Sequence, residues 1–203
     1  ITMLSMPLVG RLLGKYEARW LVVFGLLVLA TGMFQLSSLN LQTNFATFVY
    51  TWMISRGGLG FLFVPINVMA FNFIPREKTN NASGLINLAR NIGGSIGISM
   101  VTTMQSRLSQ KHQSMLVEHL SPYNLPYQHS LHSIAAALQA QGATAAQALA
   151  QARTMLYHEL TRQSAMLAYV DVFWLLGATC IGMIPLMFLM KRTRPHKGPM
   201  AAH

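Results

Sequence analysis

Long apolar runs separated by short polar connections are the dominant pattern along this chain. Four runs are close to, or longer than, the roughly 20 residues that a membrane-spanning helix needs. They cover residues 20–39, 46–74, 82–104 and 165–190. The shorter run 1–9 precedes them and fits the end of another helix. We therefore predict an all-α membrane protein with about four full transmembrane helices after an N-terminal helix tail.

The chain begins in the middle of apolar sequence. Its first residue is Ile1, and neither an initiator methionine nor a basic leader with a cleavage site stands before the first span. We therefore expect a C-terminal fragment of a longer protein.

Positive charge in the connections predicts the orientation of the spans. The connections 10–19 and 75–81 and the tail 191–203 are basic, whereas 37–45 carries no charge. Basic connections remain in the cytoplasm, and long loops cross the membrane largely regardless of charge. We therefore predict that both basic connections and the C-terminus are cytoplasmic, and that segment 105–164 is external.

The external segment is predicted to contain a helical hairpin. Residues 131–141 and 145–169 are rich in Ala, Leu and Gln, which are strong helix formers. Gly142 separates the two arms, and Thr144 with Gln147 fits a capping box at the start of the second arm, which runs into the last span. The arms carry apolar residues that either dock a partner or pack against each other. These are Leu131, Ile134, Leu138, Leu149, Met155, Leu156 and Leu160.

Composition supports a membrane protein and argues against nucleic-acid binding. Only 10% of the 203 residues are charged and 52% are hydrophobic, whereas a soluble domain carries about 25% charged residues. The net charge of +10 comes from bases that flank apolar runs rather than from a basic, aromatic-rich surface. The single Cys180 lies in an apolar run and is interpreted as a packing residue.

Two arginines are exceptions to this distribution. Thirteen of the fifteen Lys and Arg lie in connections, but Arg56 and Arg90 lie inside the second and third runs. Each is about ten residues from the ends of its run, near the middle of a hydrocarbon layer about 30 Å thick. An arginine there costs several kcal/mol unless it faces protein, water or a ligand. Each therefore either lines a substrate cavity or binds backbone carbonyls to stabilise a helix, and the sequence leaves both alternatives open.

Asparagines add polar atoms at a similar depth. Asn87 and Asn91 are four residues apart on one helical face and flank Arg90, so we expect a polar patch there. Asn67 lies in the second run. These three asparagines join the two arginines as candidates for a substrate cavity.

Glycines and one proline in the same runs are interpreted as packing and bending residues. Small residues allow helices in a membrane to approach closely, and a proline inside a helix removes a backbone hydrogen bond. The residues concerned are Gly57, Gly58, Gly60, Pro65, Gly93, Gly94 and Gly97.

The sequence lacks the arrangements that catalysis or metal binding requires. It contains no paired carboxylates, no nucleophile elbow, no Walker loop and no Cys/His metal motif. Five of the seven histidines lie in the external segment without a metal-ligand spacing, so we interpret them as exposed polar residues. Of the five acids, Asp171 comes nearest to the interior of a span, one or two turns from its start. We predict no catalytic residue, metal or organic cofactor.

Three stretches resemble a known group of transporters. They read MPLVGRLLGKYEARWLV from Met6 to Val22, RGGLGFLFVPI from Arg56 to Ile66, and NNASGLINLARNIGGSIGISMVTTM from Asn80 to Met104. Together they resemble the last third of the fourteen-span drug:proton antiporters of the major facilitator superfamily, and most closely the EmrB-type multidrug exporters. The resemblance covers essentially the whole chain, and the third stretch is its most specific part.

The resemblance implies a multidrug efflux antiporter of the cell inner membrane, with a role in antibiotic resistance. It would exchange hydrophobic drugs for protons, with the proton gradient as its energy source, and would work with a periplasmic adaptor protein and an outer-membrane channel. The proton-relay acids of that group lie in the half that is absent from this chain. Two other classes remain as alternatives: a non-transporting membrane scaffold that docks a partner through the hairpin, and a membrane-embedded enzyme.

Overall fold

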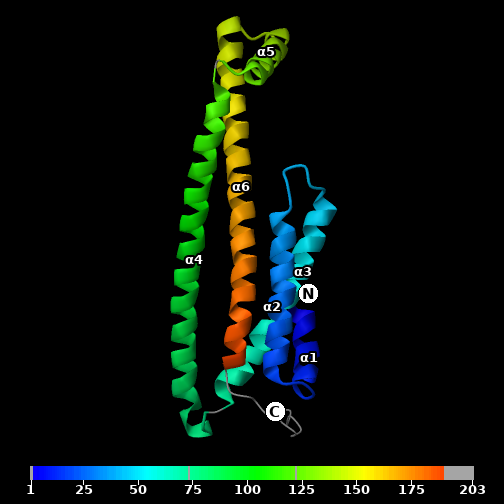
Figure 1. Ribbon diagram of the computed structural model, residues 1–203, viewed down its shortest axis with the longest axis vertical. Coiled ribbons are helices and arrows are strands. Elements are labelled where there is room, and N and C mark those ends of the chain that lie inside the picture. Colours follow the sequence, from blue (N-terminus) through cyan, green and yellow to red (C-terminus); the bar gives the residue numbers. More distant parts are fainter. Residues whose placement is uncertain (1, 73, 122, 190–203) are drawn as a thin grey trace. The chain divides into compact units, whose positions relative to one another are not determined.

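A computed structural model describes residues 2–72, 74–121 and 123–189. All regular structure in these residues is helical, which confirms the predicted all-α class. The elements are α1 (Thr2–Leu13), α2 (Ala18–Ser37), α3 (Phe45–Phe71), the short 3-10 helix η1 (Arg76–Lys78), α4 (Thr79–Val117), the 3-10 helix η2 (Glu118–Leu120), α5 (Leu125–Ala140) and α6 (Ala145–Leu189), drawn in Figure 1.

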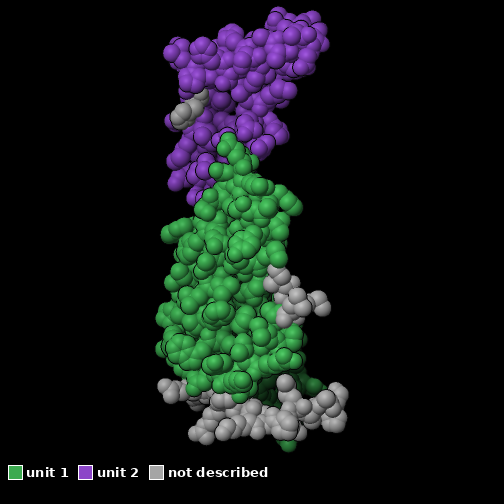
Figure 2. Space-filling view, turned by 90° about the vertical axis from the view of Figure 1, so that its right-hand side faces the viewer, with its two compact units in different colours: residues 1–99, 172–203 green, residues 100–171 purple. Residues whose placement is uncertain are grey.

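The chain forms two compact units, which Figure 2 distinguishes by colour. One unit comprises residues 1–99 and 172–203, and the other comprises residues 100–171. Helices α4 and α6 each contribute one part to each unit. The predicted cytoplasmic tail 191–203, together with Met190, lies outside the described residues.

In the first unit, α2 and α3 pack closely because glycines face each other across their contact. A Cβ atom added to Gly58 would lie 2.9 Å from the carbonyl oxygen of Gly25, closer than real Cβ atoms approach. Gly32, about two turns further along α2, lies equally close to Ser55 of α3. One face of the highly apolar α2 is buried, and this face includes Val22 and Leu26.

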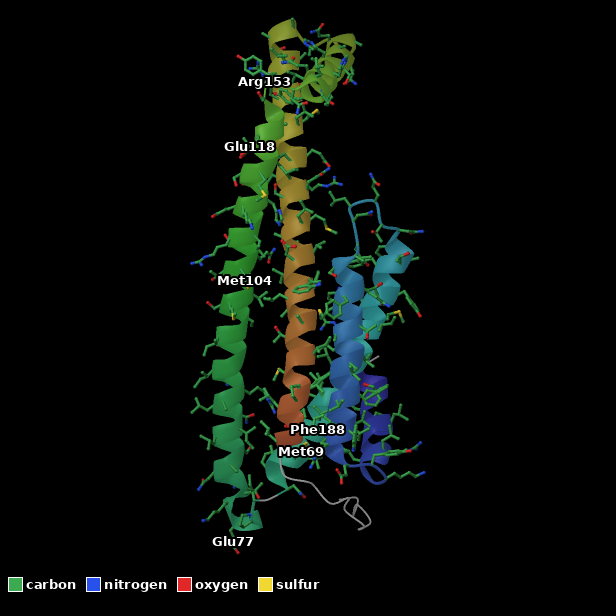
Figure 3. The ribbon with its side chains drawn as sticks, in the orientation of Figure 1. Met69, Glu77, Met104, Glu118, Arg153 and Phe188 are labelled. Carbon is green, nitrogen blue, oxygen red and sulfur yellow. The ribbon has the colours of Figure 1, made fainter. Side chains whose placement is uncertain are left out.

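An apolar core lies at one end of this unit. Its buried members are Ala18, Val22, Leu26 and Met69, and Met187 of α6 packs against them. Figure 3 labels Met69 and Phe188 at this end of the unit. The ring of Phe188 makes an edge-to-face contact with Trp20, with ring centroids 5.7 Å apart. The core therefore joins the start of α2 to the ends of α3 and α6.

Helix α3 begins at a side-chain cap and continues through its proline. The Asn44 side chain accepts a hydrogen bond of 3.3 Å from the backbone N–H of Ala46, as expected for an N-cap residue. Pro65 is buried inside α3, and the helix extends six residues beyond it. The predicted second run therefore forms one helix in the structure.

The second unit contains the predicted helical hairpin. Thr144 and Gln147 form the reciprocal hydrogen bonds of a capping box, of 3.3 and 3.4 Å, at the start of α6. Gly142, in the turn before it, has a φ of +99°, a conformation that glycine adopts without steric cost. Leu131 and Ala135 of α5 pack against two alanines of α6, Ala148 and Ala152.

The first arm is longer than the sequence indicated. We expected it to begin at Leu131, but α5 begins at Leu125, where the Asn124 side chain accepts a hydrogen bond from the N–H of Tyr127. Asn124 is therefore the N-cap of a helix that starts six residues before the predicted arm. That the hairpin is external remains a prediction.

Helix α4 also extends further than predicted. The apolar run ends at Met104, but the helix continues to Val117 with a sequence that is rich in Gln and Ser. Partly buried residues recur along this extension at helical spacing. They are Val101, Met104, Gln105, Leu108, Ser109, His112, Gln113 and Leu116. The polar composition of this extension did not predict a helix. The partly buried residues form a narrow inner face, and their packing stabilises the helix.

Three helices of the described residues are long and apolar enough to cross a membrane: α2, α3 and α6. The predicted third span, 82–104, lies within α4, which does not reach the same hydropathy. Polar residues in the run, Asn87, Arg90 and Asn91, account for the difference. That α4 spans the bilayer therefore remains a prediction.

Candidate functional site

Arg90 joins α4 to α3 within the first unit. Its Nη2 atom donates a hydrogen bond of 2.8 Å to Oδ1 of Asn67. Its guanidinium carbon lies 5.2 Å from the ring centroid of Phe63, one turn before Asn67 on α3. An aromatic face within about 6 Å attracts a cation through the ring quadrupole. Arg90 is thus held by one amide oxygen and one ring of the neighbouring helix.

Asn67 is itself fixed by a second hydrogen bond. Its Nδ2 atom donates to the backbone carbonyl oxygen of Phe63 at 2.8 Å. This bond directs the amide nitrogen toward the helix backbone and leaves the amide oxygen free to accept from Arg90. The bond from Arg90 uses one of the five N–H donors of a guanidinium. The exposed Arg90 side chain therefore keeps donors for a ligand or for water.

Arg56 is held differently, by the ring of a residue on its own helix. Its guanidinium carbon lies 4.2 Å from the ring centroid of Trp52, four residues earlier on α3. Its backbone carbonyl oxygen accepts a hydrogen bond of 3.1 Å from the Thr2 hydroxyl of α1. The contact that the structure shows for the Arg56 guanidinium is therefore with a ring, and its role in stabilising a helix or lining a cavity remains a prediction.

An open groove of about 480 Å³ adjoins Arg56. Aromatic and aliphatic side chains of α3 form most of its lining. The lining residues are Thr2, Phe45, Phe48, Val49, Trp52, Met53 and Arg56. A surface of this kind suits an amphipathic molecule, because rings bury apolar area while one cation orients a polar group.

The predicted patch of Asn87, Arg90 and Asn91 is not joined by hydrogen bonds in the described structure. Asn87 and Asn91 are exposed on α4, and Arg90 reaches across to Asn67 instead. The structure therefore brings together Arg90 and Asn67 from the predicted candidates. It leaves Asn87, Asn91 and Arg56 outside that contact.

The glycines divide into two groups. Gly58 and Gly60 lie against backbone and side-chain atoms of α2 and α1, as their predicted packing role requires. A Cβ atom added to Gly93, Gly94 or Gly97 would meet nothing within 4 Å among the described residues. Helix packing by this second group therefore remains a prediction.

Comparison with known proteins identifies a matching protein family. Residues 1–98 match the model of the Major Facilitator Superfamily. This part of the chain is similar to members of that superfamily. The match confirms the predicted resemblance to a fragment of a major facilitator transporter of the EmrB type. It indicates a membrane transporter rather than an enzyme.

Several curated relatives match most of the chain. The colistin resistance protein EmrB of Acinetobacter baumannii is 27% identical and covers 82% of this chain and 34% of its own length. The multidrug export protein EmrB of Escherichia coli K12 is 24% identical, with coverages of 94% and 36%. The fatty acid resistance protein FarB of Neisseria gonorrhoeae is 24% identical, with coverages of 91% and 35%.

The chain therefore spans about a third of the length of these major facilitator relatives. No solved structure gives a significant match to it. Among the described residues, no group of three or more His, Cys, Asp or Glu is placed to hold a metal ion.

The structure also reveals a polar pair that the sequence analysis did not find. Nε2 of His112 lies 2.7 Å from Oδ2 of Asp171, and the pair joins α4 to α6 within the second unit. The interpretation of His112 as an exposed polar residue was wrong, because its side chain is only 21% exposed. The two residues are 59 positions apart, so no local spacing could have paired them. Their only sequence signal was that Asp171 is an acid within an apolar run.

Proposed function

We propose that this chain is the C-terminal portion of a proton-coupled multidrug efflux transporter of the cell inner membrane. The family match supports a major facilitator transporter, and the names of the relatives support drugs and other amphipathic toxic compounds as its cargo. The observation that carries most weight in this chain is the contact of Arg90 with Asn67. It joins a cation with spare donors to a polar residue of a neighbouring helix, which supports a role for Arg90 in binding the substrate.

In this proposal, Arg90 and Asn67 orient polar groups of the drug. The aromatic groove beside Arg56, lined mainly by the first half of α3, offers apolar area for the drug. Asn87 and Asn91, exposed on α4, extend the polar lining along that helix. The acids that exchange protons belong to the remaining part of the carrier, because none of the five acids here lies at the middle of a span.

The proposed orientation places the connections 10–19 and 75–81 and the C-terminus in the cytoplasm. The support is the basic character of these segments. In intact cells, a membrane-impermeant thiol reagent should label a cysteine at exposed position Ser130 and should not label one at Thr193. Labelling of position 193 in intact cells would reverse the proposed orientation.

A periplasmic adaptor and an outer-membrane channel complete the proposed system, with the hairpin as the docking element. The apolar residues that we expected to serve either docking or internal packing are mostly used for packing. Leu131, Ile134, Leu138, Leu149 and Leu156 lie in or against the hairpin's own core. A docking surface therefore has to use exposed residues, such as Leu125 and Met155, which are 72% and 52% exposed.

The test of the transport proposal measures efflux and protein abundance together in the complete carrier. Arg90→Ala should reduce drug efflux at least tenfold while abundance stays within about twofold, since the variant loses the charged donor that orients the drug in this proposal. Arg90→Lys should recover only part of the efflux, because lysine lacks the planar fork of donors. The matched control is Arg107→Ala at an exposed position of the same helix, which should leave efflux unchanged.

Three outcomes would count against this proposal. Normal efflux in Arg90→Ala would mean that Arg90 does not contact the drug. Loss of the protein from the membrane would make Arg90 a structural residue. If an assay of the complete protein with a broad drug panel detected no efflux even in the unmodified carrier, the scaffold alternative would replace transport.

A further inference from the structure

We propose that the groove beside Arg56 is a binding site for cargo that carries one anionic group on an aromatic body. The groove has a volume of about 480 Å³, and Arg56 is the one charged residue among the described residues that line it. This inference rests on the proposed transport function, because it names the chemical class of a molecule that the carrier would move.

One face of α3 forms most of the groove. Its residues in the lining are Phe45, Phe48, Val49, Trp52, Met53 and Arg56. They recur at intervals of three and four positions, which places their side chains on one side of a helix. From the first to the last of them the helix rises about 16 Å, so the face can contact a flat body along its length.

Three of these side chains stack in succession along the helix. The rings of Phe48 and Trp52 are stacked with their centroids 6.2 Å apart and an interplanar angle of 29°. The guanidinium carbon of Arg56 lies 4.2 Å from the centroid of the Trp52 ring. Because the three residues are four positions apart, each lies about one turn after the previous one. The stack thus places a cation at one end of an aromatic surface.

The contact with the ring leaves the hydrogen-bond donors of Arg56 available. A cation–ring contact is an attraction to the ring face and uses no N–H donor in a hydrogen bond. The described residues supply no hydrogen-bond partner to this guanidinium. Its planar fork of N–H groups matches the paired oxygens of a carboxylate or phosphate, and such charge-assisted bonds are stronger than neutral ones.

No acid of the first unit neutralises Arg56 among the residues that the structure describes. Neither α1 nor α3 contains an acidic residue. The acids of this unit are Glu17, which lies 3.7 Å from Arg19, and Glu77, which lies in η1 beyond the far end of α3. A cation inside a span is costly unless it faces protein, water or a ligand. Charge complementarity therefore favours an anionic occupant.

The order of apolar and charged residues distinguishes cargo from a lipid of the bilayer. Helix α3 is long and apolar enough to span a membrane. A phospholipid keeps its headgroup at the membrane surface and its chains in the interior. The groove has the reverse order, because Phe45 and Phe48 lie nearest the helix start and Arg56 lies near its middle. A carried molecule can adopt this orientation, whereas a bilayer lipid in its usual orientation does not match it.

The experiment measures the binding of two fluorescent probes to the complete carrier in phosphatidylcholine nanodiscs, with empty nanodiscs as the background. Anilinonaphthalene sulfonate and phenylnaphthylamine have the same rings, but only the first carries a sulfonate. Arg56→Gln should weaken binding of the sulfonate about tenfold, as expected for the loss of a charged hydrogen-bond donor, and should leave binding of the neutral probe within about twofold.

Two further variants complete the design. Arg56→Lys keeps the charge without the planar fork, so it should recover part of the sulfonate binding and none of the difference should appear with the neutral probe. The matched control is Arg11→Gln, which removes an exposed cation of the same unit outside the groove and should leave binding of both probes unchanged.

Three results would overturn the proposal. Equal sulfonate binding by Arg56→Gln and the unmodified carrier would mean that Arg56 does not bind the anion. Loss of both probes in Arg56→Gln and in Arg56→Lys would make Arg56 a structural residue. If the effect of Arg56→Gln disappeared when phosphatidylglycerol was added to the nanodiscs, an anionic lipid would be the occupant.

Efflux of the same probes from cells separates this proposal from the transport proposal. Normal efflux of phenylnaphthylamine without any dependence of sulfonate binding on Arg56 would refute the anion site and leave transport intact. Sulfonate binding that depends on Arg56, without efflux of either probe by the unmodified carrier, would refute transport and leave a binding site that does not serve cargo.

Discussion

Helices α3 and α4 each combine one mid-helix arginine with a group of three glycines, yet their neighbours differ. Gly58 and Gly60 of α3 lie against α2 and α1, and α3 buries Thr51, Ser55 and Met69. Helix α4 has no buried residue among those described, and its glycines at 93, 94 and 97 meet nothing within 4 Å. The same sequence pattern therefore occurs at a packed contact and on an open face.

This difference shows what such a pattern does and does not specify. Glycines permit close approach but do not attract a partner, so the contact depends on the shape of the opposing helix. On α3, that shape comes from Gly25 and Gly32 of α2. On α4, large apolar residues beside the glycines, such as Leu85 and Ile96, are 68% and 62% exposed. In a membrane, such a face is covered by lipid or by another helix.

The largest expected effect tests the packed helix. Gly58→Val places a Cβ atom 2.9 Å from the Gly25 carbonyl oxygen and 3.0 Å from the Leu29 nitrogen, and backbone atoms cannot move aside cheaply. We expect a loss of about 1–3 kcal/mol in stability, as is usual for overpacking. The measurement is the thermal unfolding midpoint of the purified protein in detergent. An unchanged midpoint would mean that α2 and α3 separate easily.

The second effect tests the bond that joins the two helices. In a double-mutant cycle of Arg90→Met and Asn67→Leu, the coupling energy should be about 1–2 kcal/mol, the range for a hydrogen bond to a charged group. Unfolding midpoints of the four variants supply the cycle. A coupling near zero would mean that the two side chains part in the membrane, and α4 would then lack this connection to α3.

A smaller effect is expected for the interactions of the two arginines with their aromatic partners, and the energies of these two interactions can be compared. Trp52→Leu should cost about 0.5–1 kcal/mol beyond the loss of apolar area, because Arg56 lies 4.2 Å from that ring. Phe63→Leu should cost less, since Arg90 lies 5.2 Å from a ring with a weaker quadrupole. Repeating each substitution in an Arg→Met background isolates the cation–ring part. A larger value for Phe63 would contradict this ranking.

The smallest effect concerns the open face of α4. Gly94→Ala should change stability by less than about 0.5 kcal/mol, as for a surface position, or raise it slightly because alanine favours helices. The same unfolding assay applies. A loss comparable to that of Gly58→Val would mean that another segment of the complete protein packs on this face. The contrast between α3 and α4 would then vanish.

The hairpin shows which structural features can be predicted from residues that are neighbours in the sequence. Thr144 and Gln147, three residues apart, predicted the capping box that the structure contains, because capping depends on neighbouring residues only. Leu125 as the start of α5 was missed, since Asn124 and Pro126 are as typical of turns as of helix starts. The helical extension of α4 to Val117 was missed because its polar composition conceals a narrow inner face.

The sequence by itself determined the all-helical class, the positions of the apolar helices and the two unusual arginines. These features follow from hydropathy and length, which act along the chain. Only the tertiary structure decided that Arg90 bonds Asn67 rather than its helical neighbours, and that His112 bonds Asp171. Contacts of this kind join residues 23 and 59 positions apart. They depend on which helix faces meet, and that is fixed by packing between helices rather than by any local pattern.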